Sequence, residues 1–213
     1  DLSAARGPAV TIHLHHGDLP ADVTFGDSVA IDTETMGLNP NRDRLCLVQL
    51  SSGDGNAHLV KFGPGEIDAP NLCRLLADPD VEILFHFGRF DIAAMYNTFG
   101  ALAAPVYCTK IASRMVRTYT DRHGLKDNLK EMLDIDVSKA QQSSDWGASE
   151  LTDAQLQYCA NDVLHLHAIK SGLEDMLKRE GRLELAQACF DFLPVRAKLD
   201  LEGWDGVDIF AHS

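Results

Sequence analysis

Three short stretches of the sequence combine carboxylates and apolar residues in a pattern that suggests metal-ion chemistry. In the first, AIDTETMGL, Asp32 and Glu34 stand two positions apart behind a hydrophobic run. Side chains at i and i+2 of a strand point to the same face, so both carboxylates would project together from the strand's carboxyl end. Like charges this close raise each other's pKa, and a divalent cation removes that penalty. Oxygen-only ligation favours Mg²⁺ or Mn²⁺ over zinc.

The second and third stretches add two acids and a tyrosine. In LFHFGRFDI, Asp91 falls in the first turn of a predicted helix, where the helix dipole alone would also favour an acid. In QYCANDVLHL, Tyr158 and Asp162 are four residues apart and share one face of a helix. An Asp beside an apolar stripe needs a partner, and a cation shared with Asp32 would supply one. Each acid taken alone is explained at least as well as a solvated, helix-capping or boundary residue.

Hydrophobic periodicity and turn residues predict the elements that must position these side chains. The sequence predicts strands at 27–35, 44–52, 57–62, 81–87 and 105–109, and helices at 68–77, 88–100, 109–117, 124–134, 151–180 and 182–203. The stretch HLHH at 13–16 alternates like a strand, or alternatively forms a histidine metal cluster, and is not counted in the sheet. Thr152 is the expected N-cap of the long helix and Gly181 its expected end. Three antiparallel-type strands followed by strand–helix alternation predict a mixed sheet with helices over it.

Length and composition indicate one sizeable core, since the chain has 213 residues of which 45% are hydrophobic. No apolar run is long enough to span a membrane, and DLSAARGPAV lacks the apolar region of a signal peptide. The five cysteines form no C-x-x-C pair, and their odd number does not suit a disulfide framework. A reducing compartment is therefore expected, and the predicted localisation is cytoplasmic.

The net charge of −13 counts against a large nucleic-acid footprint, because proteins that bind duplexes without sequence preference are normally basic. The charge is uneven, however, and residues 89–139 carry 8 Lys and Arg against 6 Asp and Glu. Two interpretations stay open for this segment: solvated helix faces, or a local strip that faces a polyanion. Arg89 and Lys139 are the candidates for phosphate contacts.

The motifs DTETMGL, HFGRFD and YCAND, in this order and spacing, resemble the three exonuclease motifs of the DEDD superfamily. Tyr158, four residues before Asp162, matches the tyrosine subtype, whereas the histidine subtype would need His in place of Gln157. LCLVQLS after the first motif and SSDWGASELTDAQLQYCAND around the third are similar to ribonuclease D in particular, over about residues 12–180. The chain resembles a short form without the C-terminal helical RNA-binding domains of long ribonuclease D proteins.

This resemblance implies an α/β fold of the ribonuclease-H-like (DnaQ-like exonuclease) type, with a mixed five-stranded sheet flanked by helices. The expected organisation is an exonuclease domain at 1–181 and a C-terminal helical extension at 182–213 packed on the same domain. The implied function is a metal-dependent 3′–5′ exoribonuclease that removes nucleotides from single-stranded 3′ ends in RNA processing or turnover. The alternatives are a 3′–5′ DNA exonuclease and a non-catalytic nucleic-acid-binding module of the same fold. No membrane partner is expected, and the choice between monomer and homodimer stays open.

The resemblance also implies roles for the five chemical side chains. Asp32, Glu34, Asp91 and Asp162 would bind two divalent ions, Mg²⁺ or Mn²⁺, for two-metal-ion hydrolysis. Asp32 would bridge both ions, Glu34 and Asp162 would hold the ion that carries the attacking water, and Asp91 the ion at the leaving group. Tyr158 would orient the attacking water.

Three further residues are expected to bind substrate if the resemblance holds. Thr35 would bond the terminal 3′ hydroxyl, Met36 would wedge between the last bases, and His86 would contact the scissile phosphate or the terminal sugar. A core-filling methionine and a hydrogen-bonded strand-end histidine are the structural alternatives. Trp146 is expected to be a packing anchor near the site, with base stacking as its alternative.

Overall fold

The computed structural model of the chain describes residues 9–213, and residues 1–8 lie outside the described part. Six strands form one mixed sheet in the order β1-β4-β3-β2-β5-β6. Their bounds are β1 Thr11–His16, β2 Ser28–Thr35, β3 Leu45–Ser51, β4 Asn56–Lys61, β5 Glu82–Phe85 and β6 Val106–Cys108. Strands β2, β3 and β4 pair antiparallel, and β5 and β6 continue parallel to β2. The predicted mixed α/β sheet is confirmed, with one strand more than expected.

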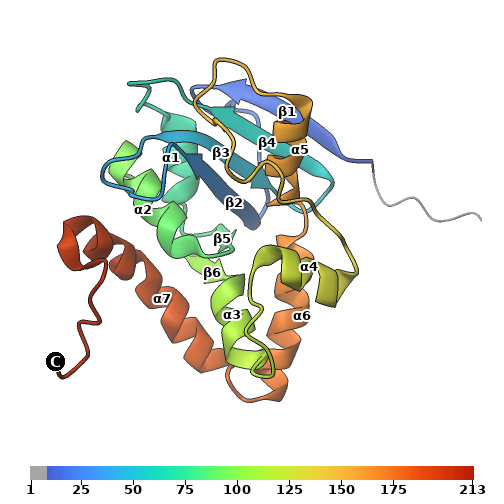
Figure 1. The fold of residues 1–213 in the computed structure, drawn as a ribbon, viewed down its shortest axis with the longest axis vertical. Coiled ribbons are helices and arrows are strands. Elements are labelled where there is room, and N and C mark those ends of the chain that lie inside the picture. Colours follow the sequence, from blue (N-terminus) through green and yellow to red (C-terminus); the bar gives the residue numbers. More distant parts are fainter. Residues whose placement is uncertain (1–8) are drawn as a thin grey trace, which may run out of the picture.

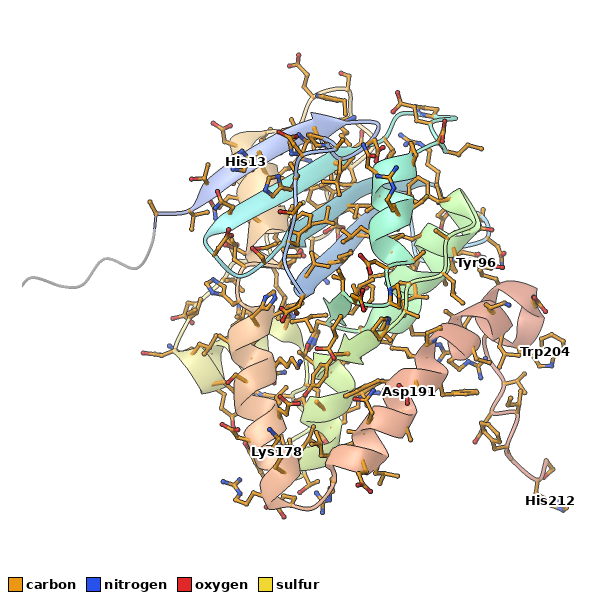
Figure 2. All side chains as sticks on the ribbon, turned by 180° about the vertical axis from the view of Figure 1, so that it is seen from behind. His13, Tyr96, Lys178, Asp191, Trp204 and His212 are labelled. Atoms are coloured by element: carbon orange, nitrogen blue, oxygen red, sulfur yellow. The ribbon has the colours of Figure 1, made fainter. Side chains whose placement is uncertain are left out.

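The additional strand is β1, which pairs in parallel with β4 at the edge of the sheet, where Figure 2 labels His13. Its histidines bond across to β4: His13 Nε2 lies 3.0 Å from Asn56 Oδ1, and His15 Nε2 lies 3.0 Å from His58 Nδ1. The histidines of β1 thus make polar contacts across the sheet and are not packed in an apolar core. For this reason the sequence of β1 lacks a clear hydrophobic pattern. Within residues 9–213, three acidic side chains elsewhere in the fold are the only set of three or more potential metal ligands that lie close together, so these histidines do not form a second such site.

Helices cover both faces of the sheet (Figure 1). Their bounds are α1 Pro70–Leu76, α2 Gly88–Phe99, α3 Thr109–Val116, α4 Leu125–Leu133, α5 Asp153–Asn161, α6 Leu166–Arg179 and α7 Leu183–Leu199, followed by a short π-helix, η1, at Asp200–Trp204. Helix α5 packs on β1 and β4, whereas α2 packs on β2, β3 and β5. Two helices that are distant in the sequence therefore pack against the same sheet. Among the described residues, no helix combines the length and apolar character needed to cross a membrane.

The single long helix predicted at 151–180 is wrong in its middle, because the chain forms two helices, α5 and α6, joined by a turn at 162–165. The amides of Val163 and Leu164 both bond back to the carbonyl of Ala160, which tightens the end of α5. The predicted start is confirmed, since Thr152 and Gln155 form a reciprocal capping box. The break places Asp162 at the C-cap of α5 instead of inside a continuous helix.

The C-terminal helix α7 lies against α2 and β6, and its Phe190 is fully buried in the main core. At its end, Asp200 is nearly buried and receives two hydrogen bonds from Arg89, at 2.5 and 2.7 Å, and two from Arg196. Figure 2 shows Trp204 and His212 on a segment that extends away from the sheet. The division into a domain at 1–181 and an extension at 182–213 stays a prediction.

Candidate active site

Strand β2 carries the first two acids to the rim of a cleft. Asp32 pairs in register with Gln49 of β3, and Glu34 pairs with Leu47. The pairing shifts register between Glu34 and Thr35, which pairs with Leu45, so an irregularity of the ladder follows directly after the D-x-E pair. Asp32 and Glu34 project from one face of β2 next to this irregularity.

Asp91 reaches the same place from the neighbouring strand. Between β5 and α2 the chain turns sharply at Phe87, whose φ of 66° is unusual for a bulky residue. Gly88 follows because a Cβ there would lie 2.6 Å from the Cβ of Phe85. Asp91 falls in the first turn of α2 and is buried, and the Thr33 hydroxyl donates a 2.6 Å hydrogen bond to its Oδ1.

Tyr158 and Asp162 approach from the opposite side on α5 and its C-cap. The Trp146 ring stacks on the Tyr158 ring with centroids 5.8 Å apart, and Trp146 is only 4% exposed. It packs with Cys46, Leu47 and other buried residues in a small core between the sheet and α5. The interpretation of Trp146 as a packing anchor is confirmed, and its position supports the ring of Tyr158.

The acids converge on the floor of a cleft of about 740 Å³. Ligand oxygens of Asp32, Glu34 and Asp162 all lie within 4.8 Å of one another. Asp91 lines the same cleft but does not belong to that group of three. Among the described residues, these four carboxylates take part in none of the ion pairs with Lys, Arg or His.

Burial without a cation raises the pKa of all four carboxyl groups. For Asp32 the pKa rises to about 6, because desolvation outweighs its hydrogen bonds to neighbouring groups. For Glu34 it rises to about 9 through burial and then through the charge of Asp32. Burial and the surrounding acids also place the pKa of Asp91 and Asp162 well above the usual range. Four such groups in one place indicate a site built for positive charge.

The site fits divalent cations on these grounds. All donors are carboxylate oxygens, which suit Mg²⁺ or Mn²⁺ rather than zinc. The carboxylates are close together, poorly solvated and without a basic partner among residues 9–213, so a cation would compensate a charge that the chain itself leaves uncompensated. The structure therefore brings together the four carboxylates that the family resemblance assigns to metal binding, and Asp91 lies outside the group formed by the other three.

The Tyr158 hydroxyl is suited to hold its proton rather than to accept one. Burial, followed by the charges of Asp162 and Glu34, raises the pKa of Tyr158 above its usual value. The phenol therefore stays neutral at physiological pH, and it can orient water by hydrogen bonding but does not act as the base.

The three residues predicted to bind substrate all line the cleft. Met36 is 54% exposed, and the Thr35 hydroxyl bonds the carbonyl of Gly37. His86 is more enclosed: its Nδ1 lies 2.8 Å from the Thr109 hydroxyl and its Nε2 lies 2.9 Å from the His123 carbonyl. Burial lowers the pKa of His86 to about 3, so the ring is neutral. A substrate contact by His86 would have to replace one of these bonds, and this contact stays a prediction.

Basic residues lie on the rim of the cleft above the acidic floor. Lys110, Lys126 and Lys139 line it from α3, from α4 and from the loop after α4. Arg89, the other residue considered for phosphate binding, is instead paired with Asp200. Some of the basic side chains of residues 89–139 thus form ion pairs within the fold, and others line the cleft.

One residue that contacts the acids was not singled out from the sequence. Gln49 on β3 is fully buried, and its Nε2 lies 3.3 Å from Asp32 Oδ2 and 3.5 Å from Glu34 Oε1. Its only sequence signal is a polar residue inside the apolar run LCLVQLS. Strand register, which the sequence does not reveal, decides that this residue faces Asp32.

Comparison with known proteins agrees with this geometry. Residues 18–178 match the family described as 3′-5′ exonuclease. A ribonuclease D from Granulibacter bethesdensis is 35% identical over 85% of this chain, and the match spans 46% of that relative. The chain thus spans about half the length of the curated relatives it matches.

Two solved structures cover almost the whole chain. One, an apo form of a nuclease, has 61% sequence identity and a TM-score of 0.94. The other, Brucella melitensis NrnC bound to pGG, has 56% identity and a TM-score of 0.93. In both cases the match covers 96% of this chain and 100% of the solved one.

Proposed function

Because this chain belongs to the 3′–5′ exonuclease family, with a ribonuclease-H-like fold, we propose that it is a metal-dependent 3′–5′ exoribonuclease that acts on single-stranded 3′ ends. The observation that carries the proposal is the convergence of Asp32, Glu34, Asp91 and Asp162, without a basic partner among the described residues, on the floor of a cleft whose rim carries lysines. We further propose that the activity is cytoplasmic, since the cysteines form no disulfide within the described residues.

In this proposal the four carboxylates hold two divalent ions, Mg²⁺ or Mn²⁺. When bound, such ions stabilise the charge that develops on the attacking and leaving oxygens of phosphoryl transfer. Tyr158 keeps its hydroxyl proton and orients the attacking water, while the stacked ring of Trp146 fixes the direction of the phenol. Asp91 is held by the hydrogen bond that the Thr33 hydroxyl donates to its Oδ1, and its side chain lines the cleft.

The terminal nucleotide would lie against the segment that follows β2. Thr35 and Met36 come directly after the acidic pair, where the pairing of β2 with β3 shifts register. We propose that Thr35 bonds the 3′ hydroxyl and that the exposed thioether of Met36 packs against a terminal base. These contacts select a free 3′ end and so explain exonucleolytic polarity.

RNA is the proposed substrate because most of the similar curated proteins are ribonucleases D, although one is a DNA polymerase I, and because the similar Brucella melitensis NrnC is bound to pGG. The test is a time course on a 3′-tailed hairpin RNA, and on matched RNA and DNA oligomers, with Mg²⁺, with Mn²⁺ and with EDTA. We expect stepwise loss of 3′ nucleotides from RNA that stops in EDTA. A strong preference for DNA would reverse the substrate assignment, and binding without cleavage in either metal would identify a non-catalytic module.

The rim lysines give a prediction about binding. Replacing Lys126 with alanine should raise KM for RNA about fivefold, the scale of roughly 1 kcal/mol for an exposed charge contact, and leave kcat nearly unchanged. The dependence of log KM on log salt should also fall in slope by about 1. Steady-state kinetics at several salt concentrations measure both quantities.

Lys130 provides the matched control on the same helix. It does not line the cleft, and it bonds Asp134 at 2.7 Å and Asp136 at 3.1 Å. Its replacement by alanine should leave KM and its salt dependence as they are. Equal effects of the two substitutions would show that the lysines act only through overall charge.

A further inference from the structure

The structure gives the acidic pair on β2 one neutral partner, Gln49, whose burial is complete. Gln49 is the register partner of Asp32 in the antiparallel pair β2–β3, so both side chains leave the same face of the sheet. The side chain of Gln49 does not line the cleft. It lies behind the carboxylates, between them and the body of the protein.

The contacts of Gln49 fix the orientation of its amide. The Nε2 group is shared between Asp32 Oδ2 at 3.3 Å and Glu34 Oε1 at 3.5 Å. The opposite orientation would place the amide oxygen against two carboxylates, which are acceptors when ionised. Gln49 Oε1 is consequently directed away from the acids, and it is buried without a hydrogen-bond partner.

An unpartnered buried carbonyl destabilises the fold, and this cost would be absent if an apolar residue stood at position 49. The neighbours Val48 and Leu50 are fully buried and apolar, as is Leu47 on the same face. The amide is also the only side-chain N–H that bonds Asp32 or Glu34 in the described part of the chain. A polar side chain that lowers the stability of the fold, and that contacts a cluster of functional residues, indicates a role in that cluster.

We infer that Gln49 is a positioning residue of the metal site, and this inference rests on the proposed function of the four acids. Its amide bonds one oxygen of Asp32 and one oxygen of Glu34, and so leaves the other oxygen of each carboxylate for the cation shared with Asp162. Groups behind the ligands that orient them in this way commonly set metal affinity.

The test is Mn²⁺ binding to the folded, metal-free protein by isothermal titration calorimetry, without nucleic acid. Gln49→Met keeps the length of the side chain but has no donor. Its dissociation constant for Mn²⁺ should rise about 10- to 100-fold. The melting temperature of metal-free Gln49→Met should be equal to or above that of the parent, because the unpartnered carbonyl is gone.

Two further variants make the result specific. Leu47→Met lies two residues away on the same face and pairs with Glu34, but it removes no hydrogen bond, so Mn²⁺ affinity should stay within about twofold. Gln49→Asn keeps a buried amide that is one methylene shorter, so it should also weaken Mn²⁺ binding, and it carries the test if the Met variant does not fold. Unchanged Mn²⁺ affinity in a folded Gln49 variant would overturn the inference.

The failure of this inference and the failure of the proposed function give different results. A parent protein that binds Mn²⁺ but cuts no nucleic acid contradicts the exonuclease proposal, and weaker binding by Gln49→Met in that protein would still support the role of Gln49. A parent protein that cuts RNA while Gln49→Met binds Mn²⁺ normally contradicts the role of Gln49 alone. A parent protein without Mn²⁺ affinity contradicts both.

Discussion

Replacing Asp91 with alanine is expected to lower exonuclease turnover by at least about 10³-fold, the scale of losing a single group that stabilises a transition state. Asp91 is buried at the floor of the cleft and supplies one of the four negative charges proposed to hold the metal ions. The chain should stay folded, because the helix that carries Asp91 is anchored by Ile92 and Met95 in the core. Single-turnover kinetics on a 3′-labelled RNA, together with circular dichroism, measure both expectations.

The isosteric variant Asp91→Asn separates charge from shape. It keeps an acceptor for the Thr33 hydroxyl and removes one of four clustered carboxylates. The metal-free variant should therefore be more stable than the parent at pH 8, because burial and the charges of Asp32 and Glu34 raise the pKa of Asp91 and disfavour its ionised form. Its melting temperature should be higher by at least about 2–4 °C, the shift that roughly 1 kcal/mol produces in a chain of this length. Asp80→Ala, at an exposed acid that lies in the turn before β5 and does not line the cleft, is the control and should change neither property.

Retained turnover in both Asp91 variants would show that the motif assignment is wrong. The other contrary outcome is that Asp91→Asn loses turnover and is also less stable than the parent without metal. In that case the Asp91 carboxylate would stabilise the metal-free fold instead of destabilising it.

The second large effect is expected from metal and pH together. The raised pKa values of Asp32, about 6, and Glu34, about 9, mean that the folded metal-free protein binds protons that the unfolded chain releases. This contribution to stability is fully present at low pH and is lost as the pH rises through the folded-state values. Metal-free protein should therefore become less stable between pH 6 and pH 9.

Divalent metal should reverse this loss. At about 1,000 times its dissociation constant a ligand adds about 4.1 kcal/mol of stability, which is about 8–16 °C in melting temperature for a chain of this size. The gain should be larger at pH 8 than at pH 6, because metal must displace protons from the carboxyl groups. Thermal unfolding at both pH values, in EDTA and in millimolar Mn²⁺, measures it, with sodium chloride of equal ionic strength as the control.

Activity should follow the same direction and rise from mildly acidic to alkaline pH. An activity optimum near pH 5, or a melting temperature that does not respond to Mn²⁺ at pH 8, would contradict the assignment of the four acids to a metal site.

The part of the site that could be predicted from the sequence is the part encoded by local spacing. Asp32 and Glu34 share a strand face because strands repeat every two residues, and Tyr158 and Asp162 lie one helical turn apart. The order of strands and helices followed in the same way from periodicity and from turn residues such as Gly100, which adopts the left-handed conformation at the end of α2.

What could not be predicted depends on contacts between distant segments. Across the turn between α5 and α6 the apolar residues keep nearly the spacing of a helix. The sequence pattern of Leu156, Val163 and Leu166 therefore resembles that of one continuous helix. Strand β1 has polar residues that are satisfied only across the sheet, at His58 and Asn56. Gln49 faces Asp32 through strand register, which no single segment encodes.

The contact between Arg89 and Asp200 joins residues that are 111 positions apart. During synthesis Arg89 emerges first, and at about 5–20 residues per second its carboxylate partner follows roughly 6–22 s later. Until then the first turn of α2, which also carries Asp91, lacks its anchor to the C-terminal helix. The nascent protein therefore completes this support of the first turn of α2 only after Asp200 has left the ribosome, and the proposed activity is expected only from that point on.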